Sequence, residues 1–353
     1  MGSKSFAVTG IPQPPVDMQE KIKWVVAKQK CNWQLPQSIQ DYQHPLFQLP
    51  SDYKDHTYPE EGVLELPGGT ATSTGANLNS SGALVTTFLT PADGKAPQYH
   101  PAYYFSLRRF FPRILTLKEP VISLTDIWQG AFFHWMYQVL PRLGLLTAPY
   151  AKIFVEQKHD FQRQSIELLG CQDCVISTAE YDAVQASQVI IPSSFLCPTH
   201  RSCQFLRDSF LPKVPILPKR KIYLSRTDAR TRRLANEVEV IDILDQYGFE
   251  RVELTPLSFR EQIAVLKSAD MVVATHGAGL SHLVFCDPGT AVLELFHANY
   301  VNNCYWQLST IRDLIYYMLF DTRPSAEIDP DIYIEPVLLR RTLEAMERDR
   351  SCR

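Results

Sequence analysis

The sequence predicts an α/β protein made of two Rossmann-like domains that face each other across a cleft. The chain has 353 residues, which is too long for one ordinary hydrophobic core. From about residue 120 onward, short apolar runs alternate with amphipathic stretches of about 10–15 residues, a pattern typical of parallel βαβ units. A proline-rich segment at 211–221 divides this alternation into two series, as a linker between domains would.

We expect four parts along the chain. Residues 1–90 are rich in Pro, Gln and small polar residues and should form a loop-rich extension packed on the first domain. Within them, residues 66–82 have the composition of a surface loop. Residues 91–210 should form the first Rossmann-like domain and residues 211–325 the second, followed by a C-terminal tail helix in 326–353.

The second domain has the clearer pattern of elements. Its helices carry recognisable ends, because Gly248 stands where a C-terminal glycine belongs and Ser258 where an N-terminal cap belongs. We expect strands at 221–225, 250–254, 270–275, 291–296 and 314–320, and helices at 236–249, 258–269, after residue 277 and at 302–313. In the first domain we expect strands at 120–126, 152–156, 174–178 and 187–192, and helices at 131–147 and 160–170.

The composition is that of a soluble globular protein, with 45% apolar and 21% charged residues. A formal net charge of -3 gives no reason to expect a nucleic-acid partner. No uninterrupted apolar run is long enough to span a membrane, and we expect a cytoplasmic protein with reduced thiols. Peripheral attachment to a membrane and the oligomeric state stay open.

A glycine-rich turn follows the apolar run at 270–275. It consists of His276, Gly277, Ala278 and Gly279. Ligands of open α/β sheets bind beyond the carboxyl ends of the strands, and glycines let the backbone approach a ligand closely. The turn is therefore a candidate phosphate site at the start of a helix. The alternative is a structural strand-to-helix turn in which the histidine is a cap.

An arginine-rich segment, 225–233, follows the first strand of the same domain. It includes Arg226, Arg232 and Arg233. A solvated charged surface is the usual explanation for such a run, but this one is expected at the same edge as the glycine turn. Guanidinium groups match the oxygens of a diphosphate, so the two segments together predict a diphosphate site that needs no metal.

Three further side chains are candidates. Glu294 lies inside an apolar strand and would either accept hydrogen bonds from ribose hydroxyls or pair with an arginine. His134 would be either a core histidine or a general base facing the cleft, and Arg142 is expected on roughly the same helix face. The Asp-x-Asp sequence at 329–331, a pattern that binds metal-nucleotide in some transferases, is interpreted as structural.

The order of these motifs resembles that of glycosyltransferase family 61. The matching residues are His134-Trp135, Leu140-Pro141-Arg142-Leu143, Ser225-Arg226, Arg232-Arg233, Asn236-Glu237 and His276-Gly277-Ala278-Gly279. The resemblance covers roughly residues 120–320. The sequence departs from the family at Gly130-Ala131, where a small polar residue is expected shortly before the histidine.

The resemblance implies a GT-B fold and an inverting transfer from a nucleotide-diphosphate sugar, with a UDP-sugar as the first choice, to a glycan or glycoconjugate acceptor. Residues 211–325 would bind the donor through Arg226, Arg232, Arg233, the turn His276–Gly279 and Glu294. Residues 91–210 would bind the acceptor, with His134 as base and Arg142 on the acceptor side. No cofactor or metal is expected, and bacterial relatives suggest a role in surface polysaccharide synthesis.

Two other functions remain open at this point. A nucleotide-sugar epimerase would share the fold and the diphosphate site but would act on the donor alone. A non-catalytic carbohydrate-binding protein would keep the fold without needing the base at His134.

Overall fold

The computed structural model describes residues 16–18, 21–37, 54–89, 112–146, 152–321, 323–327 and 330–351. These residues belong to two compact units. Unit 1 comprises the chain up to Ala27 together with Pro59–Leu196, and unit 2 comprises Lys28–Tyr58 together with Cys197 onward. The division therefore precedes the proline-rich segment 211–221, and part of the expected N-terminal extension belongs to unit 2.

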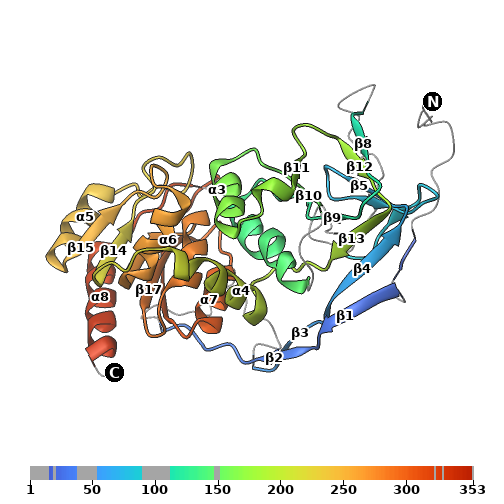
Figure 1. Ribbon diagram of the computed structural model, residues 1–353. Helices are drawn as coiled ribbons and strands as arrows, with labels where there is room; N and C mark the ends of the chain where they lie inside the picture. The colour runs from blue at the N-terminus through green and yellow to red at the C-terminus, as the bar shows by residue number, and fades with distance from the viewer. Residues whose placement is uncertain are drawn as a thin grey trace. The chain divides into compact units, whose positions relative to one another are not determined.

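Unit 2 is built on an open sheet of five parallel strands in the order β15-β14-β16-β17-β18 (Figure 1). In chain order this is 2-1-3-4-5, a doubly wound arrangement. The strands are β14 (Arg220–Leu224), β15 (Phe249–Val252), β16 (Ala269–Thr275), β17 (Ala291–His297) and β18 (Ile315–Asp321). The five strands predicted from the apolar runs are thus confirmed.

Helices cover both faces of this sheet. Its helices are α4 (His200–Phe210), α5 (Glu237–Gln246), α6 (Phe259–Lys267), α7 (Cys304–Ile311) and α8 (Pro336–Ser351). Helices α5 and α8 share one hydrophobic core with alternate residues of the strands, so the C-terminal helix is part of the unit and not a loose tail. Gly248, in the left-handed region at φ 76°, follows α5 as predicted.

The segment after the glycine turn differs from the prediction. It is a 3₁₀ helix, η6 (Ala278–Phe285), and not an α-helix. The side chains of Leu280, Leu283 and Phe285 are all buried, and η6 packs against α4, α6 and α7. A segment enclosed on all sides has no polar face, which is why the expected amphipathic helix is absent here.

Unit 1 is only partly Rossmann-like. Its six-stranded sheet has the order β1-β4-β13-β9-β10-β11, in which the last four strands are parallel and β4 runs antiparallel to both neighbours. The strands are β1 (Ile22–Val26), β4 (Glu61–Pro67), β13 (Gln188–Pro192), β9 (Val121–Ser123), β10 (Lys152–Val155) and β11 (Val175–Ser177). Helix α3 (Asp160–Leu169) ends at Gly170, close to the predicted bounds.

A second sheet in unit 1 corrects the expected surface loop at 66–82. Its order is β7-β6-β5-β12-β8, with β7 (Leu84–Val85), β6 (Asn77–Leu78), β5 (Thr70–Thr72), β12 (Ala183–Gln185) and β8 (Ile114–Thr116). The segment looked like a loop because glycine, serine and asparagine surround very short strands. The three residues of β5, Thr70–Thr72, are buried, and the β-branched threonines are suited to strands.

The single helix expected at 131–147 is also corrected. The chain forms an α-turn (α2, Phe132–His134), a π-helix (η2, Trp135–Val139) and a 3₁₀ helix (η3, Leu140–Leu145). Pro141 has no N–H to donate and its ring obstructs a regular α-turn, so the helix changes its hydrogen-bonding pattern just before it. π-turns inside helices frequently occur at functional sites.

No helix within the described ranges combines the length and the apolar character that crossing a bilayer requires.

Candidate active site

The predicted diphosphate residues gather at the switch point of the unit 2 sheet. Strands β14 and β16 are neighbours, with Leu224 paired to Ala274, whereas β15 lies on the other side of β14. The connections leaving β14 and β16 therefore diverge at their carboxyl ends, which is where ligands bind in such sheets. Ser225-Arg226 follows β14 directly and His276-Gly277 follows β16 directly.

Arg226 lies against the backbone of Gly277. A β-carbon placed on Gly277 would overlap the Arg226 guanidinium. The backbone of Gly277 is extended, with φ 176°, so its conformation does not require glycine. The absence of a side chain is needed only to make room for the arginine. The structure thus brings together two motifs that the sequence places 50 residues apart.

Arg232 is held on the same side of the unit by an aromatic ring. Its guanidinium lies 4.5 Å from the ring centroid of Tyr300, and that ring lies 5.4 Å from the ring of His276. Arg232 has φ 59°, a left-handed conformation that is unusual for a side chain of this size. The contacts connect Arg232 to the glycine turn through Tyr300, which sequence reasoning did not identify.

Arg233 does not join this group. Its backbone N–H and its Nη2 each donate to the carboxylate of Asp331, both at 3.0 Å. This contact fixes the segment before α8, and the diphosphate role of Arg233 stays a prediction. The same contact supports the structural interpretation of the Asp-x-Asp sequence, of which Asp329 lies outside the described residues.

Glu294 is buried and has partners other than those expected. Its exposed fraction is 0%, its Oε1 lies 2.5 Å from His276 Nδ1, and the hydroxyl of Tyr316 donates to its Oε2 at 2.5 Å. Burial, and then the nearby Glu294 carboxylate, raise the pKa of Tyr316 well above its usual range. In this structure the partners of Glu294 are His276 and Tyr316, and its contact with a ribose stays a prediction. It orients the His276 ring.

Aromatic side chains surround His276. Phe296 stacks on its ring at 5.3 Å, and Tyr305 lies at 5.3 Å on a tilted plane. Burial holds the pKa of Tyr305 well above its usual range, so this phenol stays neutral. Beside them, Thr275 Oγ1 is buried and has no hydrogen-bond partner within the described part of the chain, as expected of a group that meets a ligand.

Arg251 is a further residue at this edge that the sequence reasoning missed. It lies in β15, and its Nη2 donates to Ser225 Oγ at 3.3 Å, to Thr227 Oγ1 at 3.1 Å and to Glu253 Oε1 at 2.9 Å. The available signal was an arginine in an otherwise alternating strand. This network ties the start of the arginine-rich segment to the neighbouring strand.

His134 lies at the end of α2 in unit 1. Its ring is half-buried, stacks on Trp128 at 5.7 Å, and has Nδ1 hydrogen-bonded to Gln138 Oε1. Burial lowers the pKa of His134, which the contacts with Gln138 and Asp126 oppose. The imidazole is therefore neutral at pH 7, with the Nδ1 hydrogen directed to Gln138 and the lone pair on Nε2.

Arg142 is buried in unit 1, and its role on the acceptor side stays a prediction. It is 4% exposed and donates to the carbonyls of Pro192 at 3.0 Å, Ser123 at 2.8 Å and Thr125 at 3.4 Å. Burial lowers the pKa of Arg142 to about 10, which still leaves it charged at pH 7. It fastens the carboxyl ends of β9 and β13, together with Thr125, to η3.

In the described ranges, no group of three or more His, Cys, Asp or Glu side chains is arranged to hold a metal ion.

A buried histidine couples the stability of the glycine turn to pH. His282, in η6, donates from Nδ1 to the carbonyl of Gly279 at 3.2 Å, and burial lowers its pKa to about 4. As the pH falls below about 6.5, the ordinary pKa of histidine, His282 binds a proton in the unfolded chain. In the folded protein it stays unprotonated until the pH approaches 4. We expect this to cost about 2–3 kcal/mol of unfolding free energy at pH 4.5 relative to pH 7.5.

Urea unfolding at the two pH values, compared between the wild type and His282→Gln, measures this effect. The variant should lose less stability on acidification than the wild type by about that amount. An equal loss in both proteins would show that His282 is not the group responsible.

The glycine turn and His134 both lie in a region that is similar to known proteins. Residues 132–293, slightly under half of the chain, match the sequence profile of the family described as Glycosyltransferase 61. The chain is 34% identical over 104 residues to the EGF domain-specific O-linked N-acetylglucosamine transferase of Drosophila melanogaster, covering 28% of this chain and 20% of that protein.

Two other relatives give the same result. The rat (Rattus norvegicus) protein of that name is 27% identical over 125 residues, covering 34% of this chain and 23% of its own length. Beta-1,2-xylosyltransferase RCN11 of Oryza sativa subsp. japonica is 30% identical over 95 residues, covering 25% and 18%. The chain thus spans about a fifth of the length of these relatives. Over residues 132–293, which include His134, Arg226 and the glycine turn, the chain is similar to the glycosyltransferase 61 family.

Proposed function

We propose that the protein is an inverting glycosyltransferase that moves a sugar from a nucleotide-diphosphate sugar, a UDP-sugar in the first instance, to a hydroxyl of a glycan or glycoconjugate. The observation that carries the proposal is the Arg226 guanidinium lying on the side-chain-free backbone of Gly277 at the switch point of a doubly wound sheet. A fixed arginine at the carboxyl edge of such a sheet is suited to the oxygens of a diphosphate. The similarity of residues 132–293 to glycosyltransferases supports the same conclusion.

The departing diphosphate gains negative charge as the bond to the sugar breaks. Arg226 would stabilise this charge directly, and Arg232 would add a second cation held by Tyr300. His276, oriented by Glu294, would contribute a further hydrogen bond. Groups that are fixed before the reaction stabilise developing charge without a reorganisation cost. In this proposal the protein's own cations do the work, and no metal is required.

The acceptor side of the reaction would belong to unit 1, in the GT-B manner. The acceptor oxygen attacks the anomeric carbon, the carbon–oxygen bond to the diphosphate breaks, and the acceptor proton moves to His134 Nε2. A single displacement of this kind inverts the configuration at the anomeric carbon. The neutral His134 ring, with Nδ1 held by Gln138, is in the protonation state that a general base needs at pH 7.

A thermal-shift screen of the full chain, stripped with EDTA, tests the donor half of the proposal. The ligands are UDP, GDP, CDP, TDP, ADP and NAD. UDP should raise the melting temperature, because a ligand at a hundredfold excess over Kd stabilises the folded state by about 2.7 kcal/mol. A shift with NAD alone, or with none of the six, would contradict the diphosphate site. Conversion of the donor's sugar to its epimer in the absence of any acceptor would favour an epimerase instead.

A further inference from the structure

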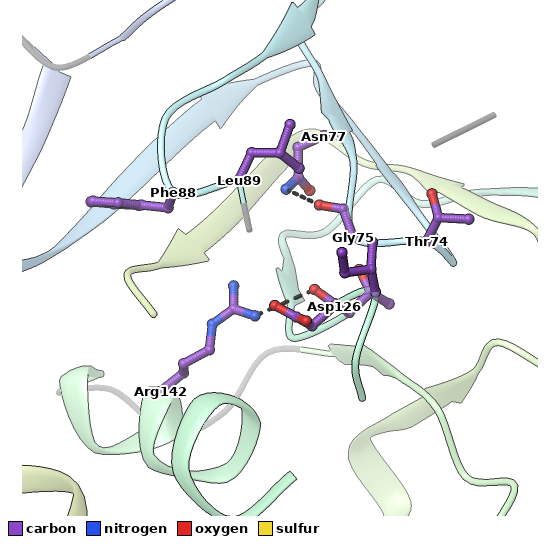
Figure 2. A pocket seen from close by; sticks show the side chains of 9 residues that line it. Thr74, Gly75, Asn77, Phe88, Leu89, Asp126 and Arg142 are labelled. Atoms are coloured by element: carbon purple, nitrogen blue, oxygen red, sulfur yellow. Dashed lines mark hydrogen bonds between the residues drawn. The ribbon is translucent and has the colours of Figure 1, made fainter. Parts of the chain in front are cut away.

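A small polar pocket lies in unit 1, apart from the glycine turn. It is formed where the β5–β6 hairpin meets the segment that follows β9 (Figure 2). Its polar lining includes Asn77, Asp126 and Arg142, and its apolar lining includes Phe88, Leu89 and Ile127. The enclosed part has room for a group the size of one water molecule, and the rest is open to solvent.

The wall of this pocket contains a buried polar atom with no partner. Asn77 is 6% exposed, and its Nδ2 donates to the carbonyl of Gly75 at 3.3 Å (Figure 2). Its Oδ1 accepts no hydrogen bond from any described residue. Leaving a buried acceptor unsatisfied costs about 1–3 kcal/mol, so such atoms are usually explained by a bound molecule.

The backbone around Asn77 is fixed with little freedom. Gly75 has φ 90°, and a β-carbon there would come within 2.9 Å of Asp126 Cα, so the hairpin packs directly on the segment after β9. Phe88 has φ 62°, a strained conformation for an aromatic residue. Strained backbone of this kind clusters at ligand sites. The pocket is thus a rigid feature of unit 1.

The charges in the pocket select the chemistry of its ligand. Asp126 and Arg142 attract each other, so the pocket has little net charge. A carboxylate or phosphate would meet the oxygens of Asp126 and Asn77, and an ammonium group would meet the Arg142 guanidinium. A hydroxyl group both donates and accepts, and it can therefore donate to Asn77 Oδ1 while accepting from Arg142.

We propose that this pocket binds a hydroxyl of a neutral sugar unit in the acceptor, with the apolar face of the sugar ring against Phe88, Leu89 and Ile127. The inference rests on the proposed transferase function and names the acceptor class that this function would use. The segment from Asp126 to His134 supplies both part of the pocket and the base. Asp126 acts electrostatically on His134, and the ring of Trp128 stacks on the His134 ring. A sugar held in the pocket would therefore lie beside the segment that carries the base.

Saturation-transfer NMR on the full chain tests the proposal with two kinds of probe. Methyl glycosides of xylose, mannose, galactose and N-acetylglucosamine represent sugars, and N-acetylserinamide represents a peptide hydroxyl. At least one glycoside should receive saturation, and Asn77→Leu should weaken its binding by about tenfold or more. Asp126→Asn, which keeps the size of the side chain, should do the same. Ser80→Ala, on an exposed residue of the same region, is the matched control.

Melting temperatures of the variants and their UDP affinities are measured in parallel. A glycoside signal that survives both substitutions, or is absent while UDP binds normally, would overturn the pocket assignment and leave the transferase function standing. A response to N-acetylserinamide and not to glycosides would overturn the choice of a sugar. Absence of UDP binding in the wild type would instead contradict the proposed function itself.

Discussion

Gly277→Ala is expected to lower kcat/KM for the donor sugar by about a hundredfold, and to have almost no effect once Arg226 is replaced by alanine. In the wild type the new methyl group would occupy the position of the Arg226 guanidinium and displace it from the turn. Loss of one fixed donor to a developing oxyanion typically costs about 10²–10³ in rate. In Arg226→Ala the guanidinium that the methyl group would overlap is gone, so the two losses should not add.

The measurement is a double-mutant cycle of kcat/KM with the single and double variants, together with their melting temperatures. An extended backbone at residue 277 accommodates alanine without strain, so Gly277→Ala should remain folded. If Gly277→Ala causes the same loss in both backgrounds, the methyl group acts on something other than Arg226, and the arrangement of the diphosphate site is wrong.

The edge at which these residues meet was predictable from the sequence. Buried parallel strands appear as short apolar runs, and the residues that follow them must lie at one edge of the sheet. Arg226 and His276 each follow such a run, so their proximity followed from the alternation alone. The order of the strands, which makes this edge a switch point, was not predictable, because no local pattern determines which strands are neighbours.

Partners of charged side chains were the least predictable part of the site. Arg233 pairs with Asp331, which is 98 residues away, and only the folded segment before α8 brings them together. Glu294 was recognised as a carboxylate that needs a partner, but its partner in the structure is His276, which directly follows the adjacent strand β16. Composition also gave the wrong prediction for residues 70–78, which were expected to form a surface loop. Their strands have only two or three residues and are too short to show the alternation of a β-strand.

His134→Ala is expected to lower kcat by about 10²–10⁴ while leaving the affinity for UDP unchanged. A general base contributes a factor of that size, and the histidine lies in unit 1, whereas the diphosphate residues all lie in unit 2. His200→Ala, on an exposed histidine of α4, is the matched control and should keep the wild-type kcat. Calorimetric titration with UDP separates a loss of turnover from a loss of donor binding.

The pH profile of kcat/KM tests whether His134 is the base. Burial lowers the pKa of His134 below its ordinary 6.5, so kcat/KM should be constant from pH 7 to 8 and should fall in acid only below pH 6.5, as the ring becomes protonated. The residual activity of His134→Ala should lack this acid limb. If the limb persists in His134→Ala, His134 is not the base, and its stack on Trp128 serves to position the acceptor.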